Sequence, residues 1–195
     1  MGKTYVELDE RLAAFIAKQH LFFVATAPSS VDGHVNVSPK GHDSLRILDG
    51  RRVAYLDYPG SGIETVAHVK ENGRIVLMLC SFSGAPNILR LYGKGRVIEP
   101  HEPDFEALLA HFEARMPPRA IVEVTLDRIQ DACGYAVPLY EYQGERDTLQ
   151  KWCLRKHEAL EMGAYQRQKN SHSIDGLPGL DADDAASVPE LSGTS

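Results

Sequence analysis

Three short clusters of small, hydroxyl and basic residues guide the interpretation of this sequence, and all three lie between positions 35 and 96. They read SPKG at residues 38–41, YPGSG at residues 58–62 and RLYGKG at residues 90–95. Each cluster borders a short apolar run of the kind that forms a β-strand, and we expect the first to be a turn. Such places let a β-barrel present backbone N–H groups and cations to a phosphate group. The stretch therefore predicts a barrel that binds a phosphorylated ligand.

The composition is that of one globular domain with a substantial core. The chain has 195 residues, of which 43% are hydrophobic, which is enough to bury a core. The net charge is −6, but the last fifteen residues hold four acidic residues and no basic one, so the rest carries only −2. A protein that binds nucleic acid needs a basic face. We therefore expect no nucleic-acid partner.

The sequence lacks the motifs of a secreted, membrane-bound or metal-binding protein, and we expect a cytoplasmic protein without a metal. Cys80, Cys133 and Cys153 are far apart and form no C-x-x-C pair, so we expect reduced, buried thiols and no zinc. The first ten residues show no signal-peptide pattern, and no apolar run is long enough to span a bilayer, so we expect no membrane partner. The eight histidines form no H-E-x-x-H or H-x-H pattern, and we expect no metal site.

The order of the expected elements is typical of a small antiparallel barrel. Asp32-Gly33 and Asp49-Gly50 are typical hairpin turns, and no G-x-G-x-x-G follows the first strand, which disfavours a parallel doubly wound fold. Gly93 and Gly95 indicate a bulge within one strand. The pattern predicts strands over residues 22–27, 34–38, 52–57, 74–80, 88–98 and 120–126, and helices over residues 8–20, 63–71, 103–115 and 148–169.

Five pieces of the sequence stand in an order that points to one known family. They are residues 23–27 (FVATA), 35–41 (VNVSPKG), 53–62 (VAYLDYPGSG), 71–78 (ENGRIVLM) and 89–97 (LRLYGKGRV). Together they resemble the pyridoxamine 5′-phosphate oxidase-like family, the FMN-binding split barrels, over roughly Glu7 to Leu139. The resemblance implies a fold that is mainly β with flanking helices: an antiparallel split β-barrel. It also implies a homodimer with two FMN sites at the subunit interface.

With this resemblance, the chain divides into three parts. Residues 1–140 form the FMN-binding split-barrel domain, residues 141–180 a C-terminal helix and closing segment, and residues 181–195 an acidic tail that we expect to be disordered. Residues 169–180 combine turn formers with apolar side chains. One hypothesis is that this segment packs over the barrel or a dimer partner and closes the flavin pocket. The alternative is a loose linker into the tail.

The same clusters supply candidate residues for the cofactor. A flavin phosphate needs fixed donors: backbone N–H groups, hydroxyls and a Lys or Arg. The first cluster offers all three, and the second precedes an expected helix whose N-terminus attracts anions. Taken alone, these clusters are also compatible with a surface turn and a flexible loop, and Arg90 with a solvent-facing residue. The predicted cofactor-binding residues are Ser38, Lys40, Gly41, Ser61, Gly62 and Arg90, with Tyr58 and Tyr135 as neighbours of the flavin ring.

Two departures from the family pattern bear on specificity. In the family, the serine that matches Ser61 is followed by Arg and Lys, but here Gly62 and Ile63 follow it. Lys40, Arg90 or Arg46 must then provide the charge. The true oxidases also carry a Trp and an Arg-x-His stretch after the last barrel strand, and residues 129–138 contain neither. This argues against a dedicated pyridoxamine phosphate oxidase.

The leading hypothesis is an FMN-dependent oxidoreductase that acts on an unidentified small molecule. Hydride chemistry belongs to the flavin, so no catalytic residue of the chain is assigned. The alternative is a non-catalytic carrier or sensor that binds a flavin, the deazaflavin F420 or haem on the same barrel.

Overall fold

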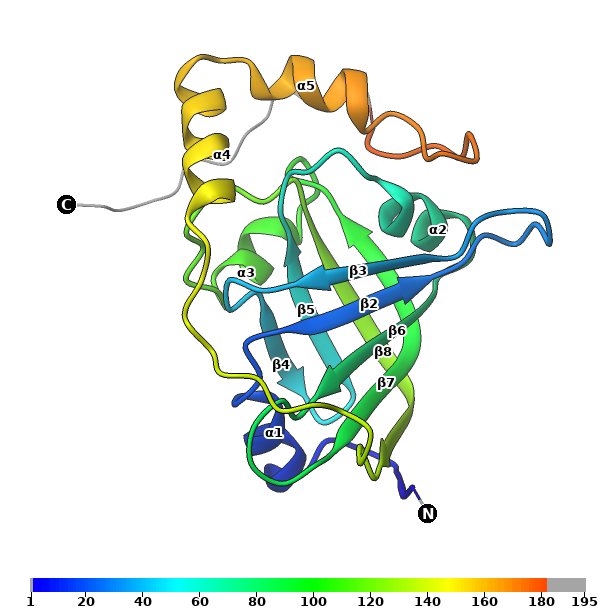
Figure 1. The fold of residues 1–195 in the computed structure, drawn as a ribbon. Helices are drawn as coiled ribbons and strands as arrows, with labels where there is room; N and C mark the ends of the chain where they lie inside the picture. The colour runs from blue at the N-terminus through cyan, green and yellow to red at the C-terminus, as the bar shows by residue number, and fades with distance from the viewer. Residues whose placement is uncertain (1, 182–195) are drawn as a thin grey trace.

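One curled antiparallel sheet forms the centre of the computed structural model, which describes residues 2–181 (Figure 1). Its strands are β1 (Thr4–Tyr5), β2 (Phe22–Thr26), β3 (Asn36–Lys40), β4 (Leu45–Asp49), β5 (Arg52–Asp57), β6 (Arg74–Cys80), β7 (Ile88–Ile98) and β8 (Ala120–Ala132). The order along the sheet is β3-β2-β6-β7-β8-β5-β4, and β1 pairs with β8. All pairings are antiparallel. The antiparallel, mainly β architecture is as predicted, and the sheet curls into a half-barrel.

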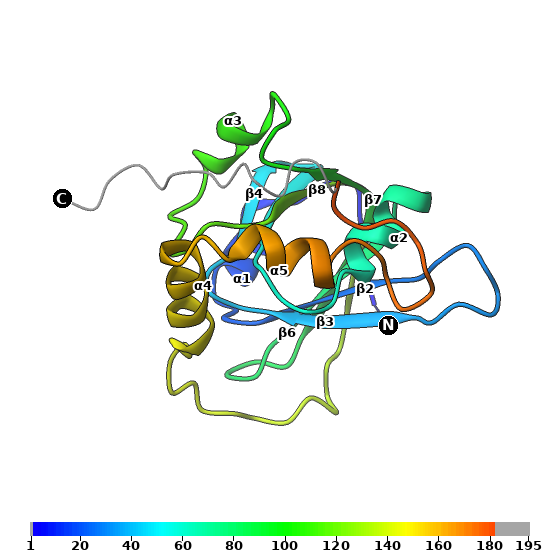
Figure 2. The ribbon, with the colours of Figure 1, turned by 90° about the horizontal axis from the view of Figure 1, so that it is seen from above.

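In the described part of the chain, five helices flank the sheet: α1 (Glu10–Ile16), α2 (Glu64–Asn72), α3 (Phe105–Leu109), α4 (Thr148–Glu158) and α5 (Met162–Lys169). The main core fills the inside of the curl, where alternate residues of the strands and one face of α2 meet. A second apolar cluster joins β5 and β8 to the last three helices through Leu56, Ile121 and Cys153. In Figure 2, which looks down on the molecule of Figure 1 from above, α4 and α5 lie over one end of the sheet.

Several elements match their expected ranges closely. β6 is a central strand between β2 and β7, and Gly73 ends α2 in the left-handed conformation with φ 71°. The register between β7 and β8 shifts between Tyr92 and Gly93, so the bulge is confirmed. A Cβ on Gly93 would lie 2.1 Å from the Thr125 carbonyl oxygen; only glycine allows the two longest strands to approach so closely.

The first cluster is not a turn, because Ser38, Pro39 and Lys40 are the last residues of β3. This strand begins two residues later than expected, at Asn36. Pro39 cannot donate a backbone hydrogen bond. An edge strand such as β3, whose one partner among the described strands is β2, tolerates this.

Three further expectations about the C-terminal half were wrong. The helix expected at residues 103–115 contains only the five residues of α3. The strand expected to end at residue 126 continues to Ala132, since its second half pairs with β7 and β1. The helix expected at residues 148–169 breaks into α4 and α5 at Leu160, whose φ is 56°.

Two other expectations concern the thiols and the tail. Cys80 and Cys153 are buried, but Cys133 is exposed, so the expectation of burial was wrong for one of the three thiols. The tail expected to be disordered lies, after Asp181, outside the described residues. Among residues 2–181, no helix has the length and apolar character that crossing a membrane requires.

Candidate functional site

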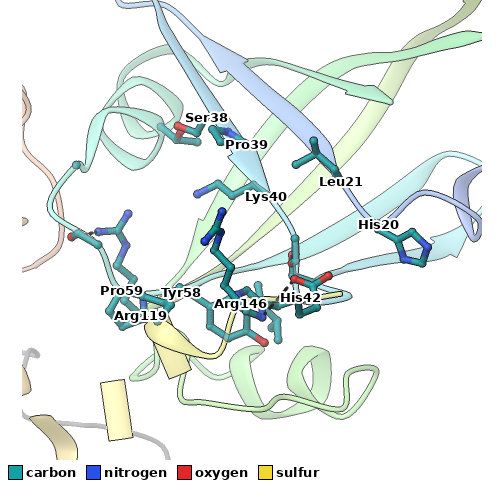
Figure 3. A pocket seen from close by; sticks show the side chains of 18 of the residues that line it. His20, Leu21, Ser38, Pro39, Lys40, His42, Tyr58, Pro59, Arg119 and Arg146 are labelled. Atoms are coloured by element: carbon teal, nitrogen blue, oxygen red, sulfur yellow. Dashed lines mark hydrogen bonds and ion pairs between the residues drawn. The ribbon is translucent and has the colours of Figure 1, made fainter. Parts of the chain in front are cut away.

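A cavity of about 770 Å³ opens between the last residues of β3, the loop after β5, the start of α2 and residues 142–149 (Figure 3). This volume lies in the range of pockets that hold small molecules and cofactors. Its charged lining residues are Lys40, Glu64, Arg119, Glu145 and Arg146, and its other lining residues include Ser38, Gly41, His42, Tyr58, Pro59, Gly60, Gly62 and Thr65.

A fully buried carboxylate fixes two of the cations. Asp57 is 0% exposed, and its Oδ1 accepts a hydrogen bond from Lys40 Nζ at 2.6 Å while its Oδ2 accepts one from Arg119 Nε at 2.9 Å. Burial by itself would raise the pKa of Asp57, but the charges of Arg119 and Lys40 outweigh it and hold this pKa at about 2. Two cations share one carboxylate, so the cluster keeps one net positive charge.

The sheet register brings this cluster together. Asp57 ends β5 directly after a run of buried residues, and it lies opposite Ala120 at the start of β8. Arg119 precedes β8, and its backbone N–H donates to the Asp57 carbonyl oxygen at 3.0 Å. A second bond from Arg119 Nη1 to the Gly60 carbonyl oxygen, at 3.0 Å, ties the loop after β5 to the same side chain.

The start of α2 lines the cavity through Gly62, Glu64 and Thr65. The N-cap residue Ile63 makes no side-chain hydrogen bond to this helix end, and the first N–H groups of a helix carry the positive potential that attracts anions. Asn36 Nδ2 donates to Thr65 Oγ1 at 2.9 Å, which leaves the Thr65 hydroxyl hydrogen free to donate. A Cβ on Gly60 would meet nothing within 4 Å, so the backbone at Gly60 is open to a ligand.

Tyr58 and His42 form an aromatic part of the cavity wall. Their rings meet edge to face, with centroids 6.1 Å apart. Burial raises the pKa of Tyr58 to about 12, so at neutral pH its hydroxyl is a neutral hydrogen-bond donor. His42 has φ 60°, an uncommon conformation for a residue other than glycine, and such strain is often found at binding sites.

Comparison with known proteins identifies the family of the chain. The family model described as pyridoxamine 5′-phosphate oxidase matches residues 8–133. The chain belongs to the pyridoxamine 5′-phosphate oxidase family. The "Pyridoxamine 5′-phosphate oxidase family protein ustO" of Aspergillus flavus is 37% identical over 192 residues, which cover 90% of this chain and 77% of that protein. The crystal structure of HupZ from Group A Streptococcus is 23% identical, covers 63% of this chain and 91% of that one, and superposes with a TM-score of 0.52; this likeness supports the fold.

The structure brings five of the predicted cofactor residues of this family member to the cavity: Ser38, Lys40, Gly41, Tyr58 and Gly62. Ser61 lies in the same loop but is not among the lining residues. Arg90 lies on β7 opposite Met78 and Gln130, and Tyr135 is 83% exposed; neither lines the cavity of one chain.

The charge at the cavity comes from residues that the sequence interpretation only partly identified. Of the three candidates, Lys40 lines the cavity, whereas Arg46 pairs with Asp43 and stacks on Phe112. Arg119 and Arg146 also line the cavity and were not predicted from the sequence. The one signal for Arg119 was Asp57 itself, because a carboxylate at the end of an apolar strand requires a buried partner. Among residues 2–181, no group of three or more His, Cys, Asp or Glu side chains could hold a metal ion.

Residues 170–181 lie against α2 and the loop after β5 (Figures 1 and 2), but they do not close the cavity as the hypothesis for residues 169–180 expected. Asn170 Nδ2 donates to the Gly60 carbonyl oxygen at 2.9 Å, and Lys70 Nζ donates to the Gly179 carbonyl oxygen at 2.8 Å. Leu180 joins the main core. None of these residues lines the cavity, so this segment supports the cavity loop from behind, and residues 142–149 form the wall.

Proposed function

We propose that the chain binds FMN in this cavity and acts as an FMN-dependent oxidoreductase on a small organic molecule. The observation that carries the proposal is the pair of cations, Lys40 and Arg119, fixed on the buried Asp57 beside the uncapped start of α2. A phosphate group needs such a set of preorganised donors. When bound, FMN would supply hydride-transfer chemistry, and the chain's own residues would bind and orient it.

The residues of the cavity fit both ends of this cofactor. Lys40, Arg119, the Thr65 hydroxyl and the first N–H groups of α2 offer donors to the phosphate. Tyr58 and Pro59 offer apolar surface to the ring. The Trp and the Arg-x-His stretch of the true oxidases are absent from the sequence, and we therefore propose a substrate other than pyridoxamine 5′-phosphate.

The purified protein should take up FMN and bind it at least about tenfold more tightly than riboflavin. The reason is that hydrogen bonds to a charged group contribute roughly 1.5–3 kcal/mol each, and riboflavin lacks the phosphate. Quenching of flavin fluorescence measures both affinities, and bleaching of the bound flavin by a reductant such as NADPH tests the oxidoreductase. A protein that takes up F420 or haem but not FMN would contradict the proposal.

The proposal includes a homodimer, which the family resemblance implies. In one chain Arg90 and Tyr135 lie outside the cavity, so a role at the cofactor requires a second copy that brings them to it. Val35, just before the edge strand β3, and Val37, within it, are exposed. Exposed apolar side chains are typical of a face that packs on a partner. We expect light scattering to give twice the chain mass of 21.6 kDa; a monomer that binds FMN fully would contradict this part of the proposal.

A further inference from the structure

Residues 140–147, here called the clasp, contribute Tyr142, Gly144, Glu145 and Arg146 to the cavity wall and lie beyond the part of the chain that the family model matches. At one end the Tyr140 N–H donates to the Phe82 carbonyl oxygen at 2.9 Å. Further along, the Tyr142 ring stacks on His20 with centroids 3.7 Å apart and an angle of 6° between the rings. The clasp is therefore seated on the barrel by specific contacts.

Beyond these anchors the clasp carries a cation, Arg146, that has no partner within residues 2–181. Glu145 accepts a hydrogen bond from the Tyr142 hydroxyl at 3.1 Å and lies 3.7 Å from His42 Nδ1. The next side chain, Arg146, lines the cavity and points into it in the direction of Lys40 (Figure 3). Within residues 2–181, no carboxylate or carbonyl oxygen pairs with its guanidinium. In this respect Arg146 differs from Lys40 and Arg119, which both bind Asp57.

The charge of a bound phosphate would exceed the positive charge that the Asp57 cluster offers. A phosphate monoester carries a charge of about −1.5 to −2 at neutral pH, and the Asp57 cluster offers only one net positive charge. Two further carboxylates, Glu64 and Glu145, line the cavity and add negative charge to it. Glu64 accepts a hydrogen bond from the Ile174 N–H at 3.3 Å, and Glu145 accepts one from Tyr142 within the clasp. A phosphate in this cavity therefore needs another cation, and the usual place for one, after Ser61, is taken by Gly62 and Ile63.

We infer that Arg146 is this cation: the clasp places its guanidinium on the phosphate and so makes the cavity select FMN over riboflavin. Arginine suits the role because its planar fork donates two hydrogen bonds to one phosphate. The inference rests on the proposed function, since it assumes that a flavin phosphate occupies the cavity.

The test compares the Arg146→Gln variant with Arg167→Gln. Arg167 is an exposed arginine of α5 that does not line the cavity, so its variant controls for the change in total charge. We expect Arg146→Gln to weaken FMN binding roughly 10- to 100-fold, to leave riboflavin binding unchanged and to make FMN binding less sensitive to salt. Arg146→Lys should recover part of the affinity, because it keeps the charge but not the fork.

Each result separates the two proposals. If the natural protein binds neither flavin, the proposed function and this inference both fail. If it binds FMN but Arg146→Gln binds FMN equally well, or loses both flavins to the same degree, only this inference is overturned. Thermal unfolding of Arg146→Gln establishes that the variant is folded, and the partial recovery in Arg146→Lys gives a readout that a misfolded loop would not show.

Discussion

The Asp57→Asn variant should lose about 3–5 kcal/mol of its free energy of unfolding, because it leaves two neighbouring cations in a buried site without their counter-charge. Lys40 is 18% exposed and Arg119 only 5%, so water can solvate neither side chain well. For a chain of this length the melting temperature should fall by roughly 10 °C. Thermal and urea unfolding measure the loss. Asp127→Asn is the matched control, because Asp127 is an exposed residue of β8.

The same residue should shape the stability at acid pH. The pKa of Asp57 is about 2 in the folded chain and close to 3.9 in an unfolded one. The ionised carboxylate therefore contributes about 2 kcal/mol above pH 4 to 5, and this contribution is lost as the pH falls towards 2. In Asp57→Asn the free energy of unfolding should therefore fall less steeply between pH 4 and pH 2 than in the natural protein. An equally steep fall in the variant would show that other carboxylates cause the loss of stability at acid pH.

The central strands could be predicted from the sequence because their own side chains define them. β6 and β7 begin and end where the apolar pattern predicts. The second half of β8 could not be predicted, because Asp127, Arg128 and Gln130 are polar. Those residues are extended because their backbone pairs with β7 and β1, and a pattern based on burial does not contain that information.

For the candidate site too, the sequence indicated the residues that lie in local clusters but not those that the fold brings from a distance. Lys40 and the loop before α2 belong to local clusters of phosphate-binding residue types, and the structure places them at one cavity. Arg119 is 62 residues away from Asp57, and the two meet only through the register of β5 with β8. Arg146 reaches the cavity through the clasp, whose position depends on the stacking of Tyr142 on His20, and nothing in its local sequence indicates this contact.

The Arg119→Met variant should weaken FMN binding by about 100-fold or more, since it removes every donor that the side chain offers while keeping much of its apolar stem. Arg119 holds Asp57 through Nε, holds the Gly60 carbonyl oxygen through Nη1 and lines the cavity. Titration with FMN and with riboflavin measures the effect. Arg128→Met is the control, because Arg128 is exposed on β8 and lies outside the cavity lining.

The pattern of losses distinguishes the two tasks of Arg119. If the guanidinium acts mainly on the phosphate, FMN binding falls and riboflavin binding stays. If it acts mainly by holding the loop at Gly60, both flavins are lost together, and Arg119→Lys, which keeps the charge without the second fixed bond, recovers neither. We expect the first pattern with partial recovery in Arg119→Lys, because Asn170 still holds the Gly60 carbonyl oxygen from the other side. If Arg119→Met binds FMN with unchanged affinity, the pair of Lys40 and Arg119 does not form the phosphate site.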